Sequence, residues 1–177
     1  MLNALLDIVK TVAQREIVPR YLKVAHERKV DGSVLTEADT AAQHALTEGL
    51  FALNQCPVLG EEMTSQEQHA LWVQHSESGL WVLDPVDGTS NFANGLPYFA
   101  VSVGFYQGGR PRMGVVYAPE ANELFWAESG KGAFLNGENL PIKTRPPGNL
   151  KHAMAGVDLK RLKPTLAAAL AARQPYA

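Results

Sequence analysis

The most informative part of the sequence is Leu80-Trp81-Val82-Leu83-Asp84-Pro85-Val86-Asp87-Gly88-Thr89-Ser90-Asn91-Phe92, in which an apolar run leads into two acids three positions apart. The apolar run predicts a buried strand. Pro85 fixes its own φ and restricts Asp84 to extended geometry, while Gly88 allows a sharp turn. We therefore expect the carboxylates of Asp84 and Asp87 to converge on one point beyond the end of the strand.

Converging carboxylates are unfavourable unless cations neutralise them, and this stretch contains the ligands that Mg²⁺ prefers. Mg²⁺ takes oxygen ligands and keeps several waters, and the stretch offers carboxylates, backbone carbonyls and hydroxyls. A further carboxylate can come from Glu61 or Glu62, which follow another short apolar run. Taken alone, each acid could instead stabilise a turn or lie in solvent. A chance match to the Asp84–Thr89 pattern is on the order of one in ten thousand from average residue usage, which favours a metal site.

Two helices are predicted before this stretch. Apolar residues recur at three- and four-residue spacing from Leu2 to Ile17, which predicts an amphipathic helix that ends near Pro19. The sequence Thr36-Glu37-Ala38-Asp39 has the pattern of a capping box and predicts a second helix that continues through Leu53.

Short apolar runs bounded by turns follow the second helix and predict strands. These runs are Val58-Leu59, Leu80–Leu83, Phe99–Tyr106, Gly114–Ala118, Glu123–Ala127 and Gly132–Leu135. Asn136-Gly137 is a strong hairpin signal, so we expect the middle of the sheet to be antiparallel. A further strand over Lys151–Val157 and a helix over Lys160–Ala172 are predicted near the end. The order of elements indicates a layered α+β fold, with a metal-binding domain over residues 1–148 and the start of an incomplete second αβ domain over 149–177.

Four segments carry a resemblance to a known family. They are Thr36–Asp39, Gly60–Glu62, Asp84–Thr89 and Gly130–Gly137, and in order and spacing they resemble the inositol monophosphatase family over nearly the whole chain. The motifs also occur in the wider lithium-sensitive phosphatase superfamily, which includes fructose-1,6-bisphosphatases and 3′-phosphoadenosine-5′-phosphate phosphatases. The continuation Ser90–Pro97 is closer to the inositol or histidinol phosphate type. The resemblance implies an αβαβα sandwich of the sugar phosphatase type, with its second αβ half truncated here.

The resemblance also implies which residues form the site. They are Asp39, Glu61 and Thr89 for catalysis; Glu61, Asp84, the carbonyl of Val86 and Asp87 for metal binding; and Glu61, Val86, Asp87, Gly88, Thr89 and Ser90 for substrate binding. In this scheme Asp84 bridges two Mg²⁺ ions, and a water between Glu61 and Thr89 attacks phosphorus. Asp39 accepts a hydrogen bond from Thr89, and it can serve as the capping residue at the same time. The run after Gly88 is typical of a helix start, whose N–H groups suit a phosphate.

Composition limits the remaining partners. The chain has 177 residues, 46% of them hydrophobic, and a formal net charge of −2 with no cluster of either sign, which argues against nucleic acid or an anionic membrane. The first residues lack a basic leader and a cleavage site, and the single Cys56 cannot form an internal disulfide, so we expect a cytoplasmic protein. A small phosphorylated substrate, lithium sensitivity and a homodimer are expected by analogy with the family.

The sequence leaves the substrate open. Inositol 1-phosphate is the family-typical substrate, but histidinol phosphate, fructose 1,6-bisphosphate or a nucleotide 3′-phosphate are alternatives, and some family members are non-catalytic regulators. Relatives continue to a Trp-Asp motif whose aspartate completes the second metal site, and no Trp-Asp pair occurs in these 177 residues. We therefore expect this chain by itself to bind one Mg²⁺ weakly and to have little or no phosphatase activity.

Overall fold

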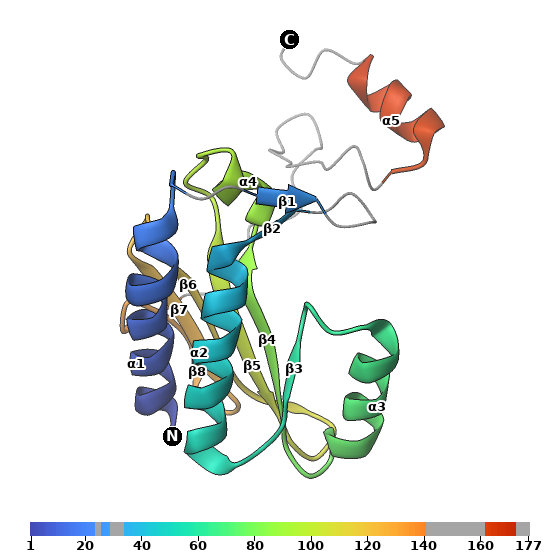
Figure 1. Cartoon of the computed structure of the whole chain (residues 1–177). Coiled ribbons are helices and arrows are strands. Elements are labelled where there is room, and N and C mark those ends of the chain that lie inside the picture. The colour runs from blue at the N-terminus through green and yellow to red at the C-terminus, as the bar shows by residue number, and fades with distance from the viewer. Residues whose placement is uncertain (24–25, 29–33, 141–161, 173–177) are drawn as a thin grey trace. The chain divides into compact units, whose positions relative to one another are not determined.

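The computed structural model describes residues 1–23, 26–28, 34–140 and 162–172 (Figure 1). The chain divides into two compact units, Met1–Leu140 and Pro141–Ala177. The domain boundary predicted after residue 148 lies outside the described residues, as does the predicted strand Lys151–Val157. In the second unit, helix α5 (Pro164–Ala171) lies within the predicted helix Lys160–Ala172.

The first helical segment confirms the predicted amphipathic helix and its end. Helix α1 (Leu2–Val12) continues as a π-helical turn over Ala13–Ile17 and a 3-10 turn over Val18–Arg20, which contains Pro19. Proline stops the helix because it lacks an N–H donor and restricts the residue before it. The apolar face of this segment is fully buried at Leu5, Val9, Ala13 and Ile17.

Helix α2 (Glu37–Asn54) begins at the predicted capping box and ends one residue beyond the predicted end. Thr36 is the N-cap residue and Asp39 stands at the third helical position. Gln55 ends the helix in the left-handed conformation with φ 56°, a frequent helix terminator. Ala42, Leu46 and Leu50 are fully buried. Figure 1 shows α1 and α2 side by side on one face of the sheet.

The main sheet has seven strands whose spatial order follows their order in the chain. They are β3 (Val58–Gly60), β4 (Leu80–Asp87), β5 (Ala100–Tyr106), β6 (Pro111–Ala118), β7 (Glu123–Glu128), β8 (Gly132–Leu135) and β9 (Glu138–Asn139). From β4 to β9 each neighbouring pair is antiparallel, and the predicted strands are confirmed. The hairpin turn between β8 and β9 places Asn136 and Gly137 at φ 50° and 89°, as a type I′ turn requires.

One strand pair is parallel, because β3 and β4 run in the same direction. Parallel neighbours need a crossover connection, and helix α3 (Ser65–His75) provides it. Helix α3 was not predicted, because it has no buried residue and no apolar stripe, although Thr64 to Glu67 has the spacing of a capping box. A small antiparallel pair, β1 (His26–Arg28) and β2 (Val34–Thr36), was likewise not predicted.

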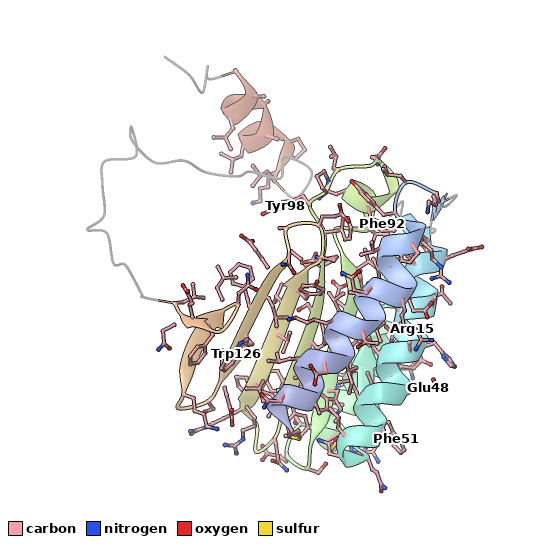
Figure 2. The ribbon with its side chains drawn as sticks, turned by 90° about the vertical axis from the view of Figure 1, so that its left-hand side faces the viewer. Arg15, Glu48, Phe51, Phe92, Tyr98 and Trp126 are labelled. Carbon is pink, nitrogen blue, oxygen red and sulfur yellow. The ribbon has the colours of Figure 1, made fainter. Side chains whose placement is uncertain are left out.

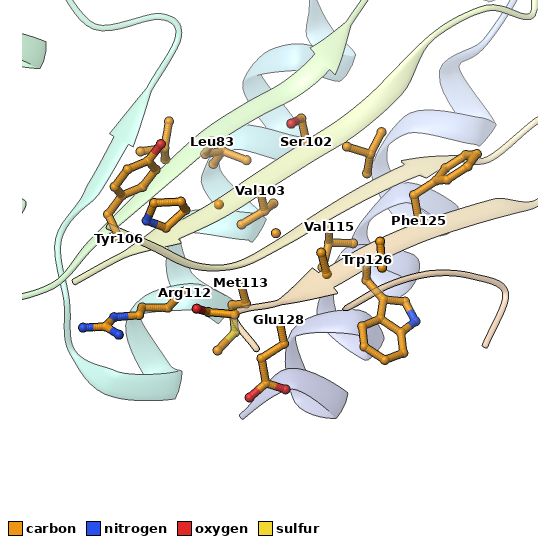
Figure 3. A pocket seen from close by; sticks show the side chains of 18 of the residues that line it. Leu83, Ser102, Val103, Tyr106, Arg112, Met113, Val115, Phe125, Trp126 and Glu128 are labelled. Carbon is orange, nitrogen blue, oxygen red and sulfur yellow. The ribbon is translucent and has the colours of Figure 1, made fainter. Parts of the chain in front are cut away.

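The core lies between the α1–α2 layer and one face of the sheet. Trp81, Val101, Val103 and Phe105 point into it with exposed fractions of 3% or less. Figure 2 shows Arg15, Glu48 and Phe51 on the outer surface of the helix layer and Trp126 on the strands. The helices and the mixed sheet form the first layers of the predicted α+β sandwich. No helix among the described residues is long and apolar enough to cross a membrane.

Candidate metal and phosphate site

The register of the two parallel strands brings the predicted acids together. Gly60 on β3 is paired with Leu83 on β4, so the next residues along the two strands, Glu61 and Asp84, are neighbours. The backbone N–H of Glu61 donates to the carbonyl of Leu83 at 3.1 Å and extends the ladder by one bond. Because parallel strands place equivalent ends at the same edge, residues 23 positions apart along the chain (84 − 61) meet at one point.

Asp84 is the residue whose surroundings are most unusual. Its Oδ1 atom is buried and has no hydrogen-bond partner among the residues that the structure describes. Burial raises the pKa of this carboxyl to about 7, and the negative charges of Glu61 and Asp87 contribute to the increase. A buried carboxylate oxygen that lacks a donor, close to two other acids, is electrostatically unfavourable without a counterion. This donor set therefore fits a hard cation.

Asp87 lies at the last position of β4, so the strand is longer than the sequence predicted. Both acids belong to the strand and do not lie beyond it. The pairing with β5 shifts register between Asp84, opposite Ser102, and Asp87, opposite Ala100. This bulge places two residues of β4, Pro85 and Val86, against the single Val101 of β5, and bulges commonly redirect side chains near active sites.

Asp39 and Thr89 meet as the resemblance implied. The Thr89 hydroxyl lies 3.1 Å from Asp39 Oδ1 and 2.9 Å from the carbonyl of Val86. A hydroxyl carries one proton and donates to one acceptor at a time, so Thr89 can exchange between a carboxylate and a carbonyl. Asp39 is only 1% exposed. Burial raises the pKa of Asp39, while hydrogen bonds from Thr36 and Thr89 oppose that increase.

Glycine is required at position 88 by its backbone conformation and its neighbours. Gly88 has φ 92° and stands at the N-cap of the short helix α4 (Thr89–Ala93). A Cβ atom at this position would lie 2.9 Å from the carbonyl oxygen of Tyr98. The turn therefore brings the start of α4 back toward the end of β4, with Thr89 and Ser90 directly after the acids.

The described residues contain no three His, Cys, Asp or Glu side chains placed to hold one metal ion together. The ligand sets implied by the family resemblance do not need three such side chains around one ion. One set combines the carboxylates of Glu61 and Asp84 with the carbonyl of Val86, and the other consists of the carboxylates of Asp84 and Asp87. Val86 is buried, and its carbonyl keeps a second lone pair beyond the one that faces Thr89.

Sequence reasoning missed two glutamines beside the site. Gln68 on α3 donates to backbone carbonyls next to Glu61, and Gln43 on α2 lies against Gly60. No sequence signal pointed to Gln68, because α3 itself was not predicted. Gln43 follows Asp39 by one helical turn on the same helix face, which is the only pattern that could have indicated it.

Fold and site together define a layered α+β protein with acids at the ends of adjacent strands. The chain matches the inositol monophosphatase family over residues 2–173, and it belongs to that family. It is 49% identical over 63 residues to a fructose-1,6-bisphosphatase/inositol-1-monophosphatase of Thermotoga maritima, covering 36% of this chain and 25% of that protein. It is 35% identical over 139 residues to inositol monophosphatase 1 of Solanum lycopersicum, covering 77% of this chain and 48% of that protein.

A solved structure of a Thermotoga maritima IMPase is similar with a TM-score of 0.71 and 29% identity. The similarity covers 81% of this chain and 54% of that structure. The chain thus spans about half the length of these relatives or less. Family membership and the α+β fold are established by these matches.

Proposed function

We propose that the whole protein is a Mg²⁺-dependent phosphomonoesterase acting on a small polyol or sugar phosphate, with inositol 1-phosphate as the first candidate. The observation that carries this proposal is the buried Oδ1 of Asp84, which has no hydrogen-bond partner among the described residues and belongs to a carboxyl whose pKa the charges of Glu61 and Asp87 help to raise. Membership of the inositol monophosphatase family supports it.

In this proposal the acids at the strand ends would hold two Mg²⁺ ions. Glu61, Asp84 and the carbonyl of Val86 would hold one ion, and Asp84 and Asp87 would hold the second. Bound Mg²⁺ would supply Lewis-acid activation of water and neutralise charge on the departing alkoxide. The backbone of Gly88, Thr89 and Ser90, together with Glu61, Val86 and Asp87, binds the phosphate ester.

The chain's own proton acceptors orient the attacking water. When the Thr89 hydroxyl donates to Asp39, which lies 3.1 Å away, its lone pairs are free to accept a hydrogen bond from water. The exposed carboxylate of Glu61 accepts the other proton of that water. Burial of Asp39 keeps this arrangement away from bulk solvent, where a competing water would otherwise solvate the carboxylate.

Asp84→Asn tests the function directly. The substitution keeps the shape of the side chain but removes the charge that both ions need, so we expect phosphate release to be abolished while the fold is retained. The increase in Tm on adding Mg²⁺ should also disappear, because only a real site gains stability as RT ln(1 + [L]/Kd). Asp7→Asn, at an exposed position of α1, is the matched control. Turnover at the wild-type rate in the Asp84→Asn protein would refute the two-ion scheme.

A substrate panel separates the remaining alternatives. Phosphate release from inositol 1-phosphate, histidinol phosphate, fructose 1,6-bisphosphate and a nucleotide 3′-phosphate would rank the substrate classes. We also expect inhibition by lithium at saturating Mg²⁺, a homodimer in light scattering and a cytoplasmic location, each by analogy with the family.

A further inference from the structure

We propose that Gln68 is a positioning residue that fixes the backbone of Glu61, with Gln43 supporting the same point from the other side. This inference rests on the proposed function, because Glu61 is there a metal ligand. Neither Gln68 nor Gln43 belongs to the site residues predicted from the sequence.

Gln68 forms hydrogen bonds to the backbone on both sides of the Glu61 α-carbon. Its Nε2 atom lies 3.0 Å from the carbonyl oxygen of Gly60 and 3.2 Å from that of Glu61. A side-chain amide has two N–H donors, so one group can serve both carbonyls. The two acceptors belong to the peptide units before and after the Glu61 side chain.

The remaining backbone group of Glu61 is also bonded. Its N–H donates to the carbonyl of Leu83 at 3.1 Å, so both hydrogen-bonding groups of this residue are engaged. Among the described residues β3 is an edge strand of the sheet, where carbonyls on the outer side have no partner strand. The Gln68 amide takes the place of that partner, together with the N–H of Met63, which lies 3.4 Å from the Gly60 carbonyl. The exposed Glu61 side chain therefore extends from a fixed α-carbon.

The position of Gln68 is itself set by the start of α3. The N–H of Gln68 donates to the carbonyl of Thr64 at 2.9 Å, and Thr64 forms a capping box with Glu67. A helix start held in this way limits the directions that the amide can take. Helix α3 thus connects β3 to β4 and, through the Gln68 amide, also fixes the backbone of Glu61, the residue directly after β3.

Gln43 contacts the same point from α2. A Cβ atom at Gly60 would lie 2.6 Å from Gln43 Nε2 and 2.7 Å from its Oε1, so the amide packs directly on the glycine. Nε2 donates to Thr47 at 3.2 Å, and the buried Oε1 has no partner in the described part of the chain. Helix α2 therefore contributes Asp39 to one part of the site and Gln43 to the other.

A purely structural role for Gln68 makes a different prediction. If Gln68 only satisfies edge carbonyls, its loss lowers Tm and leaves Mg²⁺ affinity unchanged, because water replaces the amide. If it positions Glu61, its loss weakens Mg²⁺ binding beyond any change in Tm. Residues that orient metal ligands typically contribute about 10- to 100-fold in affinity.

The test compares Gln68→Met with Gln66→Met in the 177-residue chain. Methionine keeps the length of glutamine but removes both donors, and Gln66 is an exposed residue of the same helix. Mg²⁺ affinity is measured by NMR titration, which reaches weak binding, and Tm is measured in EDTA. We expect about tenfold weaker binding for Gln68→Met and a change of less than about twofold for Gln66→Met.

A second pair of variants tests the proposal independently in case Gln68→Met does not fold. Gly60→Ala forces the Gln43 amide away from β3 and should also weaken Mg²⁺ binding, by about fivefold. This loss is smaller than the roughly 10- to 100-fold typical of residues that hydrogen-bond directly to a metal ligand, because Gln43 packs on Gly60 and not on Glu61. Gly104→Ala is its control, because a Cβ atom there meets nothing within 4 Å. Wild-type affinity in both Gln68→Met and Gly60→Ala would overturn the positioning role.

The two proposals fail in distinguishable ways. If the wild-type chain binds Mg²⁺, Asp84→Asn abolishes that binding and Gln68→Met does not alter it, the positioning role is wrong and the proposed function stands. If Asp84→Asn binds Mg²⁺ as well as the wild type does, both proposals are wrong. Weaker binding in Gln68→Met with a normal control supports both.

Discussion

Two helices of this chain begin with the same hydrogen-bonded box in opposite surroundings. At the start of α2, the N–H and hydroxyl of Thr36 lie 2.9 and 2.6 Å from Asp39 Oδ2. At the start of α3, the N–H and hydroxyl of Thr64 lie 2.9 and 2.6 Å from Glu67 Oε2. The distances agree, yet Asp39 is buried whereas Glu67 is exposed.

The difference between the boxes lies in burial and in a third partner. The second oxygen of Asp39 faces the Thr89 hydroxyl, while Glu67, within the described part of the chain, bonds only to Thr64. Burial raises the pKa of Asp39, and the hydrogen bonds from Thr64 lower the pKa of Glu67. A capping motif therefore becomes part of a site through what surrounds it, since the distances from threonine to carboxylate are the same in both boxes.

The largest expected effect is on turnover of the whole protein. Asp39→Asn removes the charge that holds the Thr89 hydroxyl, and we expect kcat to fall by at least about 100-fold, the range of a lost proton-acceptor function. Glu67→Gln makes the matched change in the exposed box and should alter kcat by less than about twofold. Phosphate release at saturating Mg²⁺ measures both. Equal losses in the two variants would show that the capping box, and not its connection to Thr89, is what matters.

A smaller effect is expected on stability. Thr36→Ala removes the cap of α2 and the hydroxyl that donates to the buried Asp39, so we expect the free energy of unfolding to fall by about 2 kcal/mol. Thr64→Ala should lose less than half as much, because water replaces the lost bonds at an exposed helix end. Urea denaturation measures both values, and Thr36→Ser should restore most of the loss. A larger loss for Thr64→Ala would reverse the comparison.

The same pair shows what the sequence could predict. The pattern from Thr36 to Asp39 predicted the start of α2, because a capping box is local and is followed by a helix with an apolar face. The box from Thr64 to Glu67 has the same spacing, but it did not lead to the prediction of a helix because no apolar stripe follows it in α3.

The site was predictable in part for a similar reason. The turn at Gly88 and the closeness of Asp84 to Asp87 follow from local sequence. The approach of Glu61 to Asp84 depends on the parallel register of β3 and β4, which no local pattern encodes. The residue pattern therefore offered Glu61 and Glu62 equally as the further carboxylate, and only the family resemblance singled out Glu61. Gln68 could not be predicted, since it acts through backbone carbonyls that carry no side-chain signature.

The smallest expected effect is a difference in the pH dependence of stability, with opposite signs for the two boxes. The folded-state pKa of Asp39 is raised above its usual value of 3.8, so the folded chain binds more protons than the unfolded chain above that pH, and stability falls as pH rises. The folded-state pKa of Glu67 is lowered from 4.5, so its ionised form stabilises the fold above pH 4.5, and this contribution is lost as pH falls.

Melting temperatures of the wild type, Asp39→Asn and Glu67→Gln between pH 3 and 8 in EDTA test these signs. The Tm of the wild type minus that of Asp39→Asn should decrease as pH rises above about 4, because only the wild type must ionise a buried carboxyl. The Tm of the wild type minus that of Glu67→Gln should instead increase as pH rises toward about 5, and then stay level. Parallel slopes would mean that burial does not separate the two boxes, and that the hydrogen bonds to Asp39 outweigh its desolvation.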